Sequence, residues 1–433
     1  MNLQPIENAL GEEVLAGTHD SGLRVVVVRK PGFSRTFGVF TTNYGSIDDR
    51  FVDPKTGAPM HVPDGVAHFL EHKMFEDERG DVSDRFSALG AMSNAFTSFT
   101  NTSYLFSTSS QELECLDLLL DFVQEPYFTP ELVKKEQGII GQEIRMYDDD
   151  PSWRIYFGLL QALFSEHPVR INIAGTEESI ARIDPEVLFA CHRAFYRPAN
   201  MVLTLVGAID PEAATARIDA DLAQRRDTWG GTAHRRKPFV DATIRARTAT
   251  LDMDVARRKL LLGFKEHELS SEGLAVERRE IATNLVLELL FGRSSKTYER
   301  LYAQGLVDES FSAQYSGEFD FGFAAIGGDT DDPDRLEQEL LRAADEFARN
   351  GPDRADLDRI RRMSVGRFAG QFNSTESVAL GFASASMRDL TPFDSLHLLR
   401  AITPEEVHAR GKALLDASRC ARSVLEPRAE STS

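Results

Sequence analysis

The chain has 433 residues, with 42% hydrophobic and 27% charged side chains, and its formal net charge is −19 at pH 7. This length exceeds what one ordinary hydrophobic core organises, so we expect two domains or a duplicated unit. The acidic excess argues against nucleic acid and anionic membranes as partners, because both carry negative charge. No run of apolar residues is long enough to span a bilayer, so we also expect no membrane-spanning segment.

The N-terminal residues and the cysteines predict a cytoplasmic protein. Residues 1–8 carry neither a basic stretch nor an apolar core, so they do not read as a secretory signal. Cys115, Cys191 and Cys420 are far apart and odd in number. This usage is typical of reduced thiols, and it argues against a disulfide framework or a second metal site.

A β-rich run at residues 37–42 precedes a predicted helix that carries the motif His68-Phe69-Leu70-Glu71-His72, of the form H-x-x-E-H. On a helix, His68 and His72 lie on one face, where two imidazoles can hold one Zn²⁺ at about 2.0–2.1 Å. Glu71 projects beside the same metal and can take a proton from zinc-bound water, as the base of a metallopeptidase must. The alternative interpretation is an exposed helix with two surface histidines.

Two further elements follow the motif helix. Residues 90–106 are rich in Thr, Phe and Tyr with partial alternation, which predicts a strand or a pair of strands. Residues 131–147 predict a helix, in which Glu136 and Glu143 share a face because they are seven residues apart. A tetrahedral catalytic site needs a third protein ligand and leaves its fourth position to water. A carboxylate on a packed helix is well placed to supply that ligand to a metal on a neighbouring helix.

The two motifs together resemble the insulinase–pitrilysin family of zinc peptidases. The matching stretches are H-F-L-E-H and E-Q-G-I-I-G-Q-E-I-R-M-Y-D-D-D-P, with 143 − 72 = 71 residues from the last histidine to the second glutamate. The resemblance implies that Glu143 is the third zinc ligand and that Glu136 is a carboxylate that orients a ligand. For Glu136, simple solvation on a charged helix stays open as an alternative. The donor types also suit Mn²⁺ or Co²⁺, so the sequence does not exclude these ions in place of zinc.

The stretch from Ser93 to Thr97 fits the same family, because it reads S-N-A-F-T. In the family, a similar S-N-A-x-T stretch is an edge strand on which the substrate lies as an added β-strand. The resemblance therefore implies that Asn94 and Ala95 contact the substrate backbone next to the scissile bond. The alternative is an ordinary buried strand.

The chain reads as two copies of one unit. Residues 183–187 have an echo in residues 402–406, at an offset of 402 − 183 = 219. In each copy, an Asp or Thr N-cap followed by Pro predicts the start of a helix. Further matched pairs are 37–42 with 259–264, the motif helix with a helix at about 274–290, 99–106 with 318–323, and 201–206 with 421–425.

The offset also tests whether the second copy carries the same chemistry. The four motif positions His68, Glu71, His72 and Glu143 correspond, within a few residues, to Leu287, Leu290, Phe291 and Arg362. No H-x-x-E-H motif occurs in that region. We therefore expect the second half to have no active site of its own and to help enclose the site of the first half.

The predicted fold class is α+β, with two duplicated halves that each contain a mostly antiparallel sheet and helices packed on one face. The resemblance implies the same architecture, as in the subunits of mitochondrial processing peptidase. The predicted domains are an N-terminal catalytic half at residues 1–228, a linker at 229–242 and a C-terminal non-catalytic half at 243–433. The join is placed there because charges and a Gly pair in residues 225–231 break any regular pattern.

One segment departs from the family pattern. Active members use an Arg and a Tyr from a C-terminal domain to orient the substrate carbonyl and stabilise the developing oxyanion. In the similar segment here, Tyr302 stands where the Arg is expected and Asp308 where the Tyr is expected, and neither Arg300 nor Tyr315 has the required spacing. We therefore expect a homologous subunit to supply the pair in a heterodimer, as in the two-subunit branch of the family. A homodimer is the alternative.

The resemblance is strongest to bacterial processing-peptidase-like zinc subunits, and it covers nearly the whole chain. The predicted function is zinc-dependent hydrolysis of peptides or unfolded segments inside an enclosed chamber, with one zinc ion per chain. Two alternatives stay open. The first is a non-catalytic scaffold or peptide-binding subunit of a larger complex, and the second is a metal-binding protein without hydrolytic activity.

Overall fold

The computed structural model describes residues 1–225, 234–235 and 243–428. The chain forms two compact units: unit 1 contains residues 1–144, 172–236 and 369–393, and unit 2 contains residues 145–171, 237–368 and 394–433. The predicted linker at 229–242 lies outside the described residues, except for residues 234–235. Within the described part of the chain, no helix has the length and apolar character needed to cross a membrane.

Unit 1 is built on a seven-stranded sheet with the order β1-β2-β3-β11-β4-β10-β9. Neighbouring strands are antiparallel, except for β3 and β11, which are parallel. Every residue of β4 and β11 is buried, as expected for strands that are covered on both faces. The strands are β1 (Gln4–Pro5), β2 (Glu13–Thr18), β3 (Arg24–Arg29), β4 (Thr36–Thr42), β9 (Met92–Thr97), β10 (Thr102–Thr108) and β11 (Met201–Gly207).

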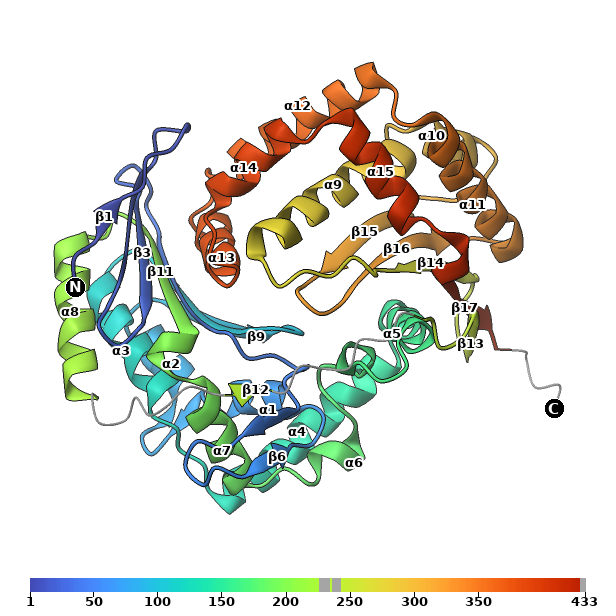
Figure 1. Cartoon of the computed structure of the whole chain (residues 1–433). Helices are drawn as coiled ribbons and strands as arrows, with labels where there is room; N and C mark the ends of the chain where they lie inside the picture. Colours follow the sequence, from blue (N-terminus) through green and yellow to red (C-terminus); the bar gives the residue numbers. More distant parts are fainter. Residues whose placement is uncertain (226–233, 236–242, 429–433) are drawn as a thin grey trace. The chain divides into compact units, whose positions relative to one another are not determined.

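Helices cover both faces of the centre of this sheet (Figure 1). α3 packs against β4 and β10, whereas α13 packs against β4 and β11 from the opposite side. The layer formed by α13 was not predicted from the sequence. The helices that lie wholly in unit 1 are α1 (Val66–Lys73), α2 (Val82–Ala88), α3 (Glu112–Gln124), α6 (Glu177–Ile180), α7 (Pro185–Phe195), α8 (Pro211–Gln224) and α13 (Thr375–Ser386). Two small sheets add β12 (His234–Arg235), β5 (Arg50–Val52) and β6 (Pro59–His61), and β7 (Glu76–Asp77) with β8 (Gly80–Asp81).

Unit 2 repeats the arrangement with a five-stranded sheet in the order β13-β17-β14-β16-β15. This order matches β3-β11-β4-β10-β9 of unit 1, and the first pair is again parallel. The α+β class and the predicted duplication are therefore confirmed. The strands are β13 (Thr248–Met253), β14 (Lys259–Lys265), β15 (Ser312–Gly317), β16 (Gly322–Asp329) and β17 (Cys420–Pro427). The helices are α5 (Pro151–Leu163), α9 (Gly273–Phe291), α10 (Lys296–Ala303), α11 (Pro333–Asn350) and α15 (Pro404–Leu414). Three helices cross the division between the units: α4 (Pro130–Asp148), α12 (Arg354–Gln371) and α14 (Pro392–Ala401).

Residues 183–187 and 402–406, whose similarity predicts the duplication, contain the starts of two equivalent helices, α7 and α15. Asp184 caps α7 by accepting a hydrogen bond from the backbone N–H of Val187. Thr403 caps α15 in the same way, from the backbone N–H of Glu406. Each cap satisfies a backbone donor that has no partner within the helix, so both predicted helix starts have a physical cause.

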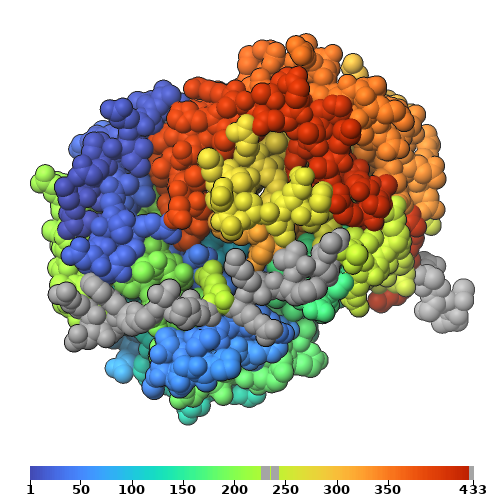
Figure 2. Space-filling view, viewed as in Figure 1, coloured from blue at the N-terminus to red at the C-terminus, as the bar shows by residue number. Residues whose placement is uncertain are grey.

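Each unit contains one helix from the other half of the sequence. α5 belongs to unit 2, where it packs against β13, β14 and β17. α13 belongs to unit 1, where Arg24 of β3 donates to the carbonyl oxygen of Ser386 and pairs with Asp389 at 2.8 Å. In Figure 2, the orange-red surface of this segment lies against the blue surface of the first strands. The two exchanged segments occupy equivalent positions in the two halves of the sequence. Adding the repeat offset of 219 to residues 145–171 gives 364–390, which nearly coincides with residues 369–393.

A buried ion cluster supports the sheet of unit 2. Glu266, which follows β14, is 3% exposed and pairs with Arg410 of α15. Its carboxylate also accepts a hydrogen bond from the hydroxyl of Tyr315 on β15 at 2.8 Å. Burial alone raises the pKa of the Glu266 carboxyl, but Arg410 and the hydrogen bonds outweigh burial and lower this pKa to about 2. The charged form of Glu266 is therefore part of the folded structure at neutral pH.

The variant Glu266→Gln is expected to lower the free energy of unfolding at pH 7 by about 3 kcal/mol, because the buried Arg410 then keeps only the exposed carboxylate of Glu268, at 3.3 Å, as a charged partner. In the wild type, the contribution of Glu266 is complete above its ordinary pKa of 4.5 and is lost as the pH falls through about 2. The stability difference between variant and wild type should therefore shrink toward acidic pH. Urea unfolding of both proteins from neutral to acidic pH checks this. Equal stability at pH 7 would contradict the expectation.

Candidate metal centre

The motif helix α1 is held in place by apolar side chains on the same helix as the histidines. Phe69 and Leu70 are fully buried, and His68 is only 8% exposed. At the start of the helix, Gly65 has a φ of 90°, and a Cβ atom added there would lie 2.4 Å from the carbonyl oxygen of Ala174. A side chain at this position would be strained and would collide with that loop. The two histidines are thus presented by a short, packed helix, not by a mobile surface helix.

The structure brings His68, His72 and Glu143 together. Nε2 of His68 lies 3.6 Å from Oε1 of Glu143, and Nε2 of His72 lies 3.5 Å from Oε2 of the same carboxylate. One ligand atom from each residue lies within 4.8 Å of the other two. These three residues are the only group of three or more His, Cys, Asp or Glu side chains placed to hold a metal ion in the described part of the chain.

The spacing of these atoms suits a shared cation. In a tetrahedral site with metal–ligand bonds of about 2.0–2.2 Å, neighbouring ligand atoms lie about 3.3–3.6 Å apart. The N···O distances of 3.6 Å from His68 and 3.5 Å from His72, each to a different oxygen of Glu143, are close to that value. They are longer than an N–H···O hydrogen bond of about 2.7–3.2 Å. Two imidazoles and one carboxylate also form the kind of donor set that zinc binds in catalytic sites.

The two imidazoles have different electrostatic surroundings. Burial, with the neighbouring His72 adding to it, lowers the pKa of His68 to about 4. Burial also favours the neutral form of His72, but the hydrogen bond that His72 donates to Glu136 and the charges of Glu71 and Glu136 outweigh burial and raise the pKa of His72. The negative charges of these carboxylates favour a proton on His72. A bound cation would take the place of that proton, because an imidazole must be deprotonated to bind a metal.

Glu136 is placed to orient His72. Its side chain lies on α4, is 5% exposed and approaches Nδ1 of His72 with Oε1 at 3.1 Å. A carboxylate that accepts the Nδ1–H of an imidazole leaves the lone pair on Nε2, which is the atom that faces Glu143. The alternative of simple solvation on a charged helix does not fit a carboxylate this deeply buried.

Glu71 lies beside His68, His72 and Glu143 and makes a contact that the sequence does not predict. The residue is 8% exposed, and its Oε2 accepts a hydrogen bond from Oγ1 of Thr97 at 2.7 Å. Burial raises the pKa of the Glu71 carboxyl, and the hydrogen bond from Thr97 partly opposes that effect. Thr97 is the last residue of the S-N-A-F-T stretch. Its place in that stretch is the sequence feature that could have identified it as a residue of the site. A carboxylate with a raised pKa is the better proton acceptor.

β9 lies at the edge of the seven-stranded sheet and pairs with β10. It carries Asn94 and Ala95, and the backbone N–H of Ala95 donates to Oδ1 of Asn94 at 2.9 Å. Met92 and Phe96 on the same strand are 69% and 40% exposed. The strand is therefore not an ordinary buried strand. The role of Asn94 and Ala95 in binding substrate stays a prediction.

The second half contains no equivalent donor set in its described residues. Leu287, Leu290 and Phe291 lie on α9, where Leu287 and Phe291 are buried in the core of unit 2 and Leu290 packs against it. Arg300 pairs with Glu339 at 3.0 Å, and Tyr315 is 9% exposed with its hydroxyl bonded to Glu266. Each of these two side chains therefore already has a carboxylate partner.

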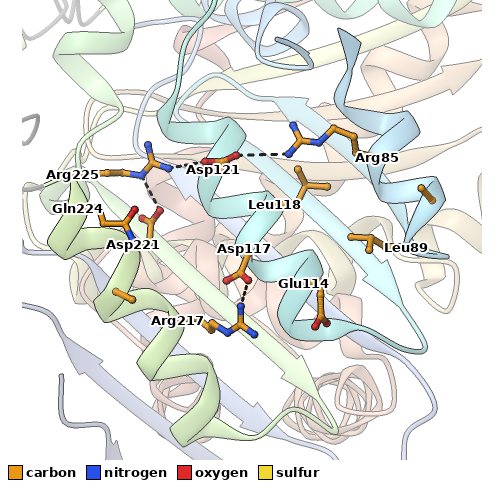
Figure 3. Close-up of a pocket in the computed structure, with 12 residues that line it drawn as sticks. Arg85, Leu89, Glu114, Asp117, Leu118, Asp121, Arg217, Asp221, Gln224 and Arg225 are labelled. Carbon is orange, nitrogen blue, oxygen red and sulfur yellow. Dashed lines mark hydrogen bonds and ion pairs between the residues drawn. The ribbon is translucent and has the colours of Figure 1, made fainter. Parts of the chain in front are cut away.

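A groove of about 600 Å³ lies elsewhere in unit 1, between α2, α3 and α8 (Figure 3). Most of its charged side chains pair with one another. Arg217 pairs with Asp117, and Arg225 pairs with Asp121 and Asp221 at 2.9 and 2.8 Å. Because these charges neutralise one another, the groove offers no concentrated set of ligands and is not a second candidate centre.

Comparison with known proteins agrees with this geometry. The sequence profile described as Insulinase (Peptidase family M16) matches residues 55–177, and the profile described as Peptidase M16 inactive domain matches residues 182–364. The uncharacterized zinc protease YmfH of Bacillus subtilis is 44% identical over 410 residues, which cover 94% of this chain and 95% of that protein.

Solved structures show the same fold. The crystal structure of an M16-like peptidase from Alicyclobacillus acidocaldarius superimposes with a TM-score of 0.93 and 34% identity, over 98% of this chain and 100% of that one. A protease from Helicobacter pylori superimposes with a TM-score of 0.81 over 96% of this chain and 100% of that one; at 19% identity it supports the fold alone. The chain therefore belongs to the insulinase family of peptidases, family M16.

Proposed function

We propose that this chain is the zinc-binding catalytic subunit of an endopeptidase that hydrolyses peptides or unfolded segments. The observation that carries the proposal is the convergence of His68, His72 and Glu143 beside the buried carboxylate of Glu71. The name of the relative YmfH supports zinc as the metal. Three buried, unpaired cysteines in the described structure support a reducing compartment such as the cytoplasm.

His68, His72 and Glu143 would hold the zinc ion, and Glu136 would keep Nε2 of His72 directed at it. When bound, the zinc ion would supply a Lewis acid that makes a water molecule easier to deprotonate and a carbonyl easier to attack. Glu71 takes the proton from the attacking water and passes it to the leaving amine. Thr97 fixes the carboxylate of Glu71 by its hydrogen bond, so the base does not have to be ordered during the reaction.

The edge strand β9 would hold the substrate in an extended conformation. A peptide added to this edge gains main-chain hydrogen bonds, which provide affinity with little demand on the substrate's side chains. Asn94 and Ala95 would contact the substrate backbone, because they lie on the same strand as Thr97, which bonds to the base. Substrates of this kind must be unfolded or flexible at the cleavage point.

The oxyanion-stabilising pair is proposed to come from a homologous subunit in a heterodimer that encloses the substrate in a chamber. In this chain, Tyr302 and Asp308 stand at the positions where the Arg and the Tyr are expected. Arg300 pairs with Glu339, and the hydroxyl of Tyr315 bonds to Glu266. A second, homologous chain that lacks the metal motif but carries the Arg and Tyr would complete the site. A homodimer would not supply them, because each copy has the same substitutions.

A non-catalytic role is the alternative. It is favoured by the profile that matches residues 182–364, since that profile describes an inactive domain. The side chains of the first half argue against a non-catalytic role. A scaffold would not require the proton acceptor Glu71 beside the convergent side chains of His68, His72 and Glu143.

The test is hydrolysis of a fluorogenic peptide by the zinc-loaded chain, alone and mixed with a homologous protein that lacks the metal motif. We expect hydrolysis in the mixture, its loss on treatment with a chelator and its recovery when zinc is restored. Zinc-loaded mixtures that form complexes but hydrolyse no peptide would favour the scaffold.

Gel filtration of the same samples tests the subunit arrangement. We expect the two homologous chains to elute together as a heterodimer. Full activity in the isolated chain would refute the shared active site and leave the proposed peptidase chemistry intact.

A further inference from the structure

Lys73, the last residue of the motif helix, is buried without a role in the chemistry described above. Its side chain is 0% exposed. A lysine is rarely buried to this extent unless its ammonium group is paired, because removing an unpaired charge from water is costly. The partners of Lys73 therefore explain why it is tolerated there.

Those partners are two carboxylates. Nζ of Lys73 pairs closely with Glu76 of β7, and it lies 3.6 Å from Oε2 of Glu136 on α4. The other oxygen of Glu136 lies 3.1 Å from Nδ1 of His72. Glu76 in turn pairs with Lys135 of α4 at 2.9 Å. Two successive residues of α1 thus face the two oxygens of one carboxylate, His72 through a hydrogen bond and Lys73 through a longer ion pair.

We infer that Lys73 is a positioning residue of the metal centre, which acts through Glu136 to keep Nε2 of His72 directed at Glu143. One oxygen of Glu136 is attracted to the ammonium group and the other is hydrogen-bonded to His72, so rotation of the Glu136 carboxylate would weaken one of these two contacts. His72 needs this support, because the lone pair on Nε2 faces the shared site only while Nδ1–H donates to Glu136. The inference rests on the proposed metal centre, but it does not depend on hydrolysis or on a partner subunit.

Two other readings make different predictions. If Lys73 acted only through its charge, its removal would strengthen cation binding, because a positive group near the site repels the metal. If Lys73 only joined α1 to β7 and α4, its removal would lower stability without an effect that depends on Glu136. Zinc affinity and its dependence on Glu136 therefore separate the three readings.

The experiment measures zinc affinity by competition with a chromophoric chelator in wild type, Lys73→Met, Glu136→Gln and the double variant. We expect Lys73→Met to weaken zinc binding by about 10–100-fold, the range typical of residues that orient metal ligands. In the Glu136→Gln background, the same substitution should change zinc affinity by less than about threefold, because the contact it acts through is already lost. Unchanged or tighter binding in Lys73→Met would overturn the inference, as would an equal loss in both backgrounds.

The matched control is Lys30→Met. Lys30 is also a buried lysine of unit 1, paired with Glu12 at 2.6 Å, and it contacts none of the residues of the metal centre. Its substitution should lower stability and leave zinc affinity unchanged. If Lys73→Met does not fold, Lys73→Gln is measured in the same way, and wild-type zinc affinity in that variant would overturn the inference. Wild-type protein that binds no zinc would instead refute the proposed metal centre itself.

Discussion

Glu71→Gln is expected to keep its zinc and to lose peptide hydrolysis by a factor of about 10²–10⁴, the usual contribution of a positioned general base. The amide has nearly the size of the carboxylate and can still accept the hydrogen bond from Thr97, so the fold and the three ligands should remain in place. It cannot take a proton from water. The measurements are kcat/KM with a fluorogenic peptide and zinc content by emission spectrometry.

Glu78→Gln is the matched control for this variant. Glu78 is an exposed glutamate shortly after the motif helix, and the same substitution there should leave both rate and zinc content unchanged. A Glu71→Gln enzyme with the wild-type kcat/KM would show that another group acts as the base. Loss of zinc together with activity would show instead that Glu71 is needed for metal binding.

Residues 1–228 expressed alone are expected not to reach a cooperatively folded state. Without residues 369–393, the face of β4 and β11 that α13 covers would be exposed. The buried side chains of α13 include Val378 and Phe382, at 3% and 1% exposure. Each such side chain contributes about 1.5–3 kcal/mol on burial, and the whole stability of a domain is about 5–15 kcal/mol.

Near-ultraviolet circular dichroism and urea unfolding of the fragment check this expectation. The control is the full chain cut between residues 228 and 243, which loses continuity but keeps α13. We expect the cut chain to stay folded and the fragment to lack fixed tertiary structure. A fragment with a native near-ultraviolet spectrum and a cooperative transition would contradict the account of the exchanged helix.

The parts of the site that were predictable depend on short sequence separations. His68, Glu71 and His72 lie within one turn and a half of helix, so their shared face follows from helical periodicity alone. Glu143 was assigned by resemblance, because no periodicity links residues on separate helices. The structure explains why α4 can supply it, since the helix lies beside α1 and is partly buried along the face that bears Glu136 and Ile140.

The parts that were missed depend on contacts between distant residues. Thr97 and Lys73 are ordinary residue types in their local sequence, and only the packing of β9 and α4 against α1 gives them their partners. The exchange of α5 and α13 has the same origin. The duplication could be read from weak echoes such as residues 183–187 and 402–406, but which sheet a connecting helix covers is decided by tertiary packing.

The zinc content of purified wild type and His72→Ala, measured by emission spectrometry after dialysis against metal-free buffer, tests whether His68, His72 and Glu143 hold a metal ion. The three-ligand centre predicts close to one zinc ion per wild-type chain and almost none in the variant, because two remaining ligands hold zinc weakly. Zinc at the wild-type ratio in His72→Ala would contradict the assignment of the centre.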